Sequence, residues 1–423
     1  MKKSIWLIVP LLSTVWMCRA QSVGQLTLDE CYKLALQNYP QVKQRELISK
    51  TADYNIENIQ KGYLPQLNIN GQASYQSAVT AIPIKLPGVN IPTLSKDQYK
   101  LYGEFNQVVY DGGAIKQQKQ LQKTTEAINE QQLETDLYQL KDRINQLFFG
   151  VLLVDAQIKQ NEMVIIDIQL GHNKIRASIK NGTAFRSNGD ILLAQLLQNK
   201  QQTINLQASR KAYTDMLGLF IGKTVDETTT LVKPSSITPS HEINRPELLV
   251  YDQQAKNLDV QNKQLTVQAL PKLNLFLQGG VSRPGLNLLS NSFDSYYIGG
   301  IKLSWSPSVF YTLKKSRALI DINSKNLDVQ KETFLFNTNL TVKQQDADMG
   351  KYQRLLATDD EIIDLRAKVK NTALVQLENG VITTNDFLTD VNDENQARQN
   401  KILHEIQLLI TQYNQQTTTG NQQ

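Results

Sequence analysis

The residues that most often carry out acid–base, nucleophilic or metal chemistry are scarce, with three histidines and two cysteines in 423 residues. His172, His241 and His404 are far apart, and no His and Cys spacing is typical of a metal site. A thiol inside a helical pattern, as at Cys31, is more often a small buried hydrophobe than a nucleophile. Asp111-Gly112-Gly113 is better explained as a tight strand-to-helix turn than as a phosphate loop. The sequence therefore predicts no catalytic site, no metal site and no cofactor.

Two aspartates follow similar interruptions in long helical patterns. Asn181-Gly182 comes before Asp190, and Asn379-Gly380 comes before Asp386. Glycine after asparagine is typical of a helix C-terminus, and aspartate is typical of the next N-cap. The sequence thus predicts two helical hairpins with short tips at residues 181–190 and 379–386, in which Asp190 and Asp386 serve as N-caps.

Long helices must position these tips. Proline is absent from Thr93 to Lys233 and from Ser308 to Gln423, and such stretches favour uninterrupted helices. Apolar residues from Leu133 to Ile158 recur at steps of four and three, which indicates a coiled-coil seam, and His172 lies on the continuation of that seam. We expect one helix from about Ala114 to Lys180 and its counterpart from about Val309 to Glu378.

Four segments alternate apolar and polar residues with the period of a β-strand. We expect strands at about 66–82, 99–110, 272–282 and 295–305, with hairpin loops at 82–96 and 283–294. The pattern repeats because the chain is duplicated: Pro40 and Pro65 recur as Pro246 and Pro271 at one offset of 206 residues. We therefore expect a first repeat at 21–222, a linker at 223–245, a second repeat at 246–413 and a disordered tail at 414–423.

The first twenty residues predict a secretory signal peptide. Lys2-Lys3 precede a short apolar run, and a small residue, Ala20, stands at the expected cleavage point. The run is shorter than the roughly 20 residues of a spanning helix. Because Arg19 also lies in this segment, a formal charge of +5 becomes +2 in the mature chain, so no nucleic acid partner is implied.

The predicted strands are about as long as transmembrane β-strands, which need roughly 9 to 11 residues, and one face of each is apolar. Four strands cannot close a barrel, and lipid does not tolerate an open edge, so several chains would have to share one barrel. Two chains would supply eight strands and three would supply twelve. The alternatives are a soluble α+β protein and a periplasmic coiled-coil scaffold that is not inserted in lipid.

Six short motifs, in order and partly duplicated, resemble the bacterial outer-membrane efflux protein family, whose best-known member is TolC. Each motif alone is weak, but together they cover essentially the whole mature chain. They are Leu26-Thr27-Leu28-Asp29-Glu30-Cys31 with Ala35-Leu36-Gln37-Asn38-Tyr39-Pro40, Tyr63-Leu64-Pro65-Gln66-Leu67, Val109-Tyr110-Asp111-Gly112-Gly113, Asn181-Gly182, Gly189-Asp190-Ile191-Leu192, and Leu217-Gly218-Leu219-Phe220-Ile221-Gly222.

The resemblance implies an α+β membrane protein that assembles as a homotrimer. Four transmembrane β-strands per chain would complete a 12-stranded barrel in the outer membrane of a Gram-negative bacterium, continuous with a long α-helical barrel in the periplasm. Such proteins are exit ducts for efflux or type I secretion and catalyse nothing. Their partners are a periplasmic adaptor (membrane fusion) protein, an inner-membrane efflux pump or ABC transporter, and outer-membrane lipid.

The resemblance also implies roles for residues at the two tips. In the family, an acidic ring at the periplasmic entrance favours cations. Asp386 is the best match to it, with Asp390 one turn later, while Asp190 and Arg186 belong to the first tip. The adaptor would dock on the tips, at Asn181, Gly182, Asn379 and Gly380. The Arg and Tyr that latch the second tip in some members are missing from Leu377 to Asn385.

Overall fold

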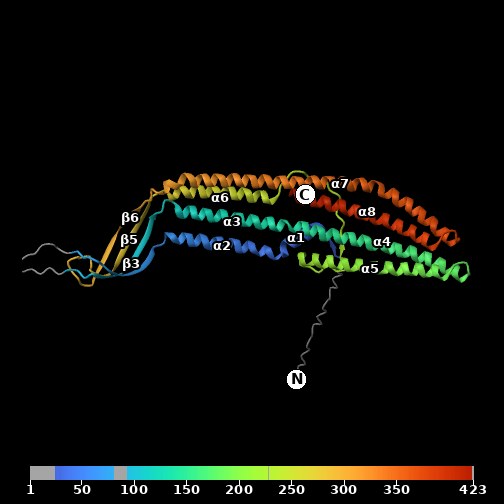
Figure 1. Cartoon of the computed structure of the whole chain (residues 1–423), viewed down its shortest axis with the longest axis horizontal. Coiled ribbons are helices and arrows are strands. Elements are labelled where there is room, and N and C mark those ends of the chain that lie inside the picture. Colours follow the sequence, from blue (N-terminus) through green and yellow to red (C-terminus); the bar gives the residue numbers. More distant parts are fainter. Residues whose placement is uncertain (1–23, 81–92, 227, 422–423) are drawn as a thin grey trace, which may run out of the picture. The chain divides into compact units, whose positions relative to one another are not determined.

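The computed structural model describes residues 24–80, 93–226 and 228–421 (Figure 1). The predicted signal peptide and most of the predicted loop 82–96 lie outside these ranges. The helices are α1 (Leu28–Asn38), α2 (Gln44–Gln60), α3 (Ala114–Tyr138), α4 (Leu140–Lys180), α5 (Arg186–Ile221), α6 (Pro246–Gln268), α7 (Val309–Glu378) and α8 (Thr384–Thr419). The strands are β1 (Gln25–Leu26), β2 (Gln66–Tyr75), β3 (Asp97–Tyr110), β4 (Thr230–Leu231), β5 (Lys272–Arg283) and β6 (Asp294–Ser304).

The chain divides into two compact units, and both sequence repeats contribute to each unit. The first unit comprises Met1–Tyr39, Lys141–Ile237 and Asp348–Tyr413, and the second comprises Pro40–Leu140, Thr238–Ala347 and Asn414–Gln423. The bounds of these units do not coincide with those of the predicted repeats, 21–222 and 246–413. The duplication remains visible in the second unit, where the order helix, β-hairpin, helix occurs once as α2-β2-β3-α3 and once as α6-β5-β6-α7.

The second unit contains one antiparallel sheet with the order β2-β3-β5-β6. β2 ends at Tyr75, earlier than the predicted strand, while the other three strands begin and end within two residues of their predicted bounds. The middle pair, β3 and β5, joins the two repeats through a register that aligns Tyr102 with Gly280. A Cβ at Gly280 would lie 2.1 Å from the Leu101 carbonyl oxygen, so only glycine fits this crossing. β2 and β6 form the two edges of the sheet.

The strand-to-helix turn predicted at Asp111-Gly112-Gly113 is confirmed. The Asp111 carboxylate accepts hydrogen bonds from the amides of Gly113 (2.8 Å) and Ile115 (2.7 Å), and both glycines have positive φ. The second repeat makes the same transition differently. There the Trp305 indole donates to the Ala269 carbonyl (3.0 Å), which fixes the end of β6 before α7 begins.

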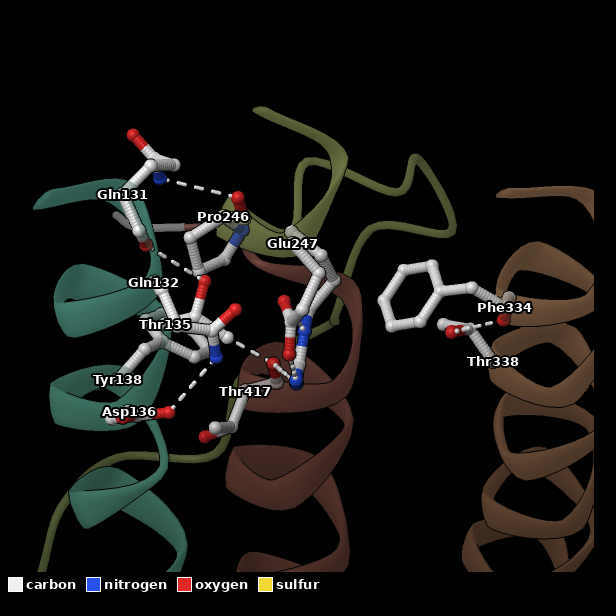
Figure 2. A network of polar contacts seen from close by, with 11 residues as sticks. Gln131, Gln132, Thr135, Asp136, Tyr138, Pro246, Glu247, Phe334, Thr338 and Thr417 are labelled. Carbon is white, nitrogen blue, oxygen red and sulfur yellow. Dashed lines mark hydrogen bonds and ion pairs between the residues drawn. The ribbon is translucent and has the colours of Figure 1, made fainter. Parts of the chain in front are cut away.

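The predicted disordered tail is wrong, because α8 continues to Thr419, and its residues from Asn414 onward belong to the second unit. The side chains of Gln415 and Thr419 are fully buried. Tyr138 on α3 donates a 2.9 Å hydrogen bond to the Thr417 carbonyl (Figure 2). The Asn244 amide donates to the Thr419 carbonyl at 2.6 Å. The polar composition of 414–423 suggested disorder. Gln415, however, donates from its side chain to the Asp346 carboxylate at 2.8 Å, and the Thr418 hydroxyl accepts from Gln345 at 3.0 Å, which are bonds that apolar residues could not make.

The long helix predicted from Ala114 to Lys180 is interrupted at Gln139, which separates α3 from α4. The seam nevertheless stays buried across the interruption, since Leu137 and Leu140 are both almost inaccessible. The counterpart α7 runs for 70 residues without a break.

A two-stranded parallel sheet of β1 and β4 in the first unit was not predicted. Its strands have two residues each, too short for an alternating pattern. β4 lies in the predicted linker 223–245. Nearby, Cys31 on α1 is fully buried, and burial raises the pKa of its thiol to about 12. The prediction that Cys31 is a buried hydrophobe is confirmed.

Candidate functional site

Both helical tips lie in the first unit, and α4 and α7 end in the same way. Gly182 and Gly380 have positive φ and donate to the carbonyls of Ile179 and Leu377 at 3.1 Å. In each tip, the amide of the next residue donates to the carbonyl five residues earlier. In the second tip, the Val381 amide donates to the Gln376 carbonyl at 2.8 Å. This is the Schellman arrangement, which satisfies the last carbonyls of a helix and favours glycine. The predicted helix ends at Asn181-Gly182 and Asn379-Gly380 are confirmed.

The predicted N-caps at Asp190 and Asp386 are wrong. α5 begins at Arg186 after the N-cap Phe185, so Asp190 lies on the second turn with an exposed side chain. α8 begins at Thr384, so its cap is formed by Thr383. The aspartate itself was predicted as the cap, but a threonine three residues before an acid is the stronger signal for an N-cap.

Asp386 instead completes a capping box with Thr383. Its carboxylate accepts hydrogen bonds from the Thr383 amide (2.9 Å) and hydroxyl (2.7 Å), and the Thr383 hydroxyl faces the Asp386 amide at 3.2 Å. These bonds hold the pKa of the Asp386 carboxyl below its usual range. The folded-state pKa is lowered, so Asp386 remains ionised as the pH falls toward that value. A fixed negative charge therefore stands at the start of α8.

The two tips share one apolar core. Phe387, the residue after Asp386, is buried and closely covers Gly171 of α4, where a Cβ would lie 2.6 Å from the ring. The cluster takes residues from both hairpins: Val164, Ile168 and Ile175 from α4, Leu192 and Leu196 from α5, Ala373 and Leu377 from α7, and Phe387, Leu388 and Val391 from α8. The structure therefore joins the two tips within one packed body.

The four predicted entrance residues differ in exposure. Arg186, Asp190 and Asp386 are exposed, and Asp390 is half-buried. Each stands on the first two turns of α5 or α8, beside residues of the shared core, and none forms an ion pair among the described residues of the chain. Three of the four side chains are thus available to solvent at one end of the first unit.

Two exposed apolar residues at the tips were not predicted. Phe185, just before α5, is 81% exposed, and Val381, in the turn before α8, is 69% exposed. Periodicity could not reveal them because they lie in turns. Their signal in the sequence was an apolar residue next to a glycine-containing tip, where polar residues are usual.

A buried charged cluster ties α4, α7 and α8 together behind the tips. Lys370 lies 2.7 Å from the Asp167 carboxylate and 2.8 Å from the Glu394 carboxylate. Glu394, 5% exposed, also accepts from Arg398 at 2.6 Å. Burial opposes the charge of Glu394, but the hydrogen bonds and charges of Lys370 and Arg398 hold its pKa below the usual range.

The sheet of the second unit has one polar and one apolar face. Register places Asn70, Gln72, Lys100 and Ser282 on one face and Leu67, Ile69, Leu101 and Leu277 on the other. Nothing in the described chain covers the apolar face: Ile69 is 77% exposed and Leu303 is 69% exposed. An open apolar sheet face of this extent marks an interaction surface.

Two of the three histidines lie beside aspartates. His404 faces Asp359 at 2.8 Å, His241 faces Asp346 at 3.1 Å, and the two pairs belong to different units. His172 is half-buried on α4, with its Nδ1 lacking a hydrogen-bond partner. No group of three possible metal ligands is present in residues 24–80, 93–226 and 228–421. Across the same ranges, no helix carries an apolar stretch long enough to cross a membrane.

Duplicated helical hairpins with a four-stranded two-faced sheet define the fold of TolC-like outer-membrane channels, and comparison with solved structures confirms this resemblance at the level of the fold. The outer-membrane channel OprN is 13% identical with a TM-score of 0.68, over 93% of this chain and 90% of that one. CusC is also 13% identical with a TM-score of 0.68, over 93% of this chain and 92% of that one. VceC from Vibrio cholerae is 12% identical with a TM-score of 0.66, over 93% and 96%. No model of a known protein family and no curated protein matches the sequence.

Proposed function

We propose that this protein is an exit duct in the outer membrane of a Gram-negative bacterium, which passes substrates from an inner-membrane pump to the exterior. The observation that carries the proposal is the uncovered apolar face of the sheet, combined with the two open edges at β2 and β6. The likeness in fold to outer-membrane channels over 93% of the chain supports it.

The sheet also supports a particular number of copies. Unpaired edge groups cost several kcal/mol each in hydrocarbon, so β2 of one copy must pair with β6 of the next until the cylinder closes. Two copies would give eight strands, whose interior is filled by side chains, whereas three give twelve and leave a lumen. A duct requires the lumen, so the proposal is a homotrimer with a 12-stranded barrel lined by the polar face of each sheet.

A second uncovered surface also favours assembly between copies. One side of α7 packs on α6, with the rings of Tyr251 and Phe334 6.1 Å apart. Another side carries exposed apolar residues at the a and d positions of a heptad, which nothing in the described chain covers. They are Leu319, Ile322, Val329, Phe336 and Leu340.

We expect Val329→Asp combined with Phe336→Asp to lower the fraction of trimer at least tenfold. Each apolar side chain contributes about 1.5–3 kcal/mol when it is buried, and the introduced carboxylates would be buried without partners. The measurement is the mass of the detergent-solubilised protein by light scattering. Gln330→Asp, an exposed polar position in the same turn, is the matched control and should remain a trimer. If the double variant also remains a trimer, this side of α7 is not the contact between copies.

The entrance is proposed to lie at the tips, where an adaptor protein would dock and where the pump or ABC transporter delivers its cargo. Three copies of Asp386 around one axis would favour cations. We expect Asp386→Asn to lower the ratio of cation to anion permeability severalfold in planar bilayers. Asp259→Asn, which removes an exposed acid on α6 of the second unit, is the matched control. An unchanged ratio would show that Asp386 does not face the lumen. The absence of any channel activity in the wild type would instead favour the periplasmic scaffold.

A further inference from the structure

A cavity lies on the polar face of the sheet, beside the loop that follows β5. Its volume is ≈ 240 Å³. Gln72 of β2, Gln98 and Lys100 of β3 and Tyr296 of β6 line one side. Leu286 and Leu288 of the loop line the other side. The cavity thus combines a polar floor with an apolar wall.

Lys100 supplies the positive charge of this cavity. Its ammonium lies 4.6 Å from the centre of the Tyr102 ring and 5.3 Å from that of Tyr296. Two aromatic faces hold a cation in place without neutralising it. Lys100 makes no ion pair within the described ranges. The carboxylate nearest on the same face by register is Asp294, two strands away, roughly 10 Å at about 4.8 Å per strand.

The other cation that borders the cavity is already neutralised. Arg283 forms an ion pair with Asp97, and its guanidinium lies over the rings of Tyr99 (5.1 Å) and Phe293 (5.3 Å). By register, Arg283 and Tyr99 point to the apolar face of the sheet. Lys100 is therefore the cation that the cavity can offer to a ligand.

Tyr296 closes the cavity beside Lys100. Its side chain is 8% exposed, and its hydroxyl, which has no hydrogen-bond partner among the described residues, is closed to solvent. Tyr296 therefore contributes to the cavity the ring over which the Lys100 ammonium lies, and not a hydrogen bond.

We propose that this cavity binds organic anions that carry one negative group and a small apolar body. A carboxylate, sulfonate or phosphate would accept hydrogen bonds from the Lys100 ammonium, and the apolar body would lie against Leu286 and Leu288. The volume is below the roughly 300 Å³ of a site for a drug-sized ligand, so it fits a small acid or the acidic end of a longer molecule.

The inference rests on the proposed function, since the polar face lines the lumen only if copies share a barrel. In that arrangement three Lys100 side chains would stand near the outer end of the duct. The protein would then favour cations at the Asp386 entrance and retain small organic anions near its exit.

The test uses 4-fluorobenzenesulfonate as the probe and the full mature chain in a neutral detergent, with binding followed by ¹⁹F NMR titration. We expect saturable binding that Lys100→Gln weakens about tenfold, as loss of a hydrogen bond to a charged group predicts. Tyr296→Phe keeps the ring beside Lys100 and should bind the probe as the wild type does. The neutral 4-fluorobenzenesulfonamide should bind at least tenfold more weakly than the sulfonate.

Lys302→Gln is the matched control, because Lys302 stands exposed on the same face outside the cavity and should bind the probe as the wild type does. Equal binding by the wild type and Lys100→Gln, or no saturable binding by the wild type, would overturn the inference. Conductance in planar bilayers tests the duct separately. A protein that binds the probe but does not conduct would refute the proposed function and leave the site standing.

Discussion

Replacing Glu394 by alanine should lower the free energy of unfolding by about 3–5 kcal/mol, the usual cost of removing one partner from a buried ion pair. The Glu394 carboxylate accepts hydrogen bonds from both Lys370 and Arg398, and its side chain is 5% exposed. Without Glu394, the buried Lys370 ammonium keeps one carboxylate partner, Asp167, and loses the other. The measurement is urea denaturation of the purified protein, followed by circular dichroism at 222 nm.

The matched control is Asp364→Ala on α7. Asp364 pairs with Lys368 one turn along the same helix at 2.6 Å, but both side chains are more than 60% exposed. Exposed pairs contribute about 0–1 kcal/mol, so this variant should unfold almost as the wild type does. If both variants lose the same small amount, the charged cluster behind the tips does not stabilise the hairpins.

The same cluster predicts a direction for the pH dependence. The folded-state pKa of Glu394 is lowered, so its contribution is present above its unfolded pKa and is lost as the pH falls through the folded value. Burial opposes the charge of Lys370, but Asp167 and Glu394 raise its pKa. The contribution of Lys370 is therefore lost as the pH rises through that raised value. Glu394→Ala should lose less stability on acidification than the wild type.

Much of the fold could be predicted because its elements carry strong periodic signals. Proline-free coiled-coil stretches identified α4 and α7, and alternation identified the four strands of the main sheet. The helix ends at Gly182 and Gly380 were predictable because a left-handed residue strongly favours glycine. These signals are local, and each depends on only a few neighbouring residues.

The rest depends on contacts between distant segments. The cluster of Asp167, Lys370 and Glu394 spans 227 positions, which no local pattern connects. The capping box of Thr383 and Asp386 could have been predicted from their spacing of three residues. It was missed because aspartate is itself a common N-cap residue. Alternation predicted the two faces of the sheet. It could not predict the cavity at Lys100, because that cavity depends on where the loop after β5 lies.

Residues 414–421 depend most clearly on such distant contacts. A chain that ends at Tyr413 should be destabilised by roughly 4 kcal/mol or more relative to one that ends at Asn421. The shorter chain loses the hydrogen bonds that the Thr417 carbonyl accepts from Tyr138 (2.9 Å) and Arg245 (3.0 Å). It also loses bonds from the Asn244 amide and to the Glu242 carbonyl, and each contributes about 1 kcal/mol. Figure 2 shows Thr417 beside Tyr138 and Glu247 in this network.

A single substitution tests the same contact without shortening the chain. Gly420 has a φ of +83°, and a Cβ there would lie 2.5 Å from the backbone of Asn244, so Gly420→Ala must strain the backbone or displace the segment. Gly350 is the matched control, since it lies within α7 and a Cβ there would meet nothing within 4 Å. Gly350→Ala should be neutral or stabilise by about 0.5–1 kcal/mol. Thermal unfolding and limited proteolysis should therefore place the two alanine variants on opposite sides of the wild type. Equal behaviour would show that the packing of residues 414–421 contributes little to the stability of the second unit, however well its hydrogen bonds are formed.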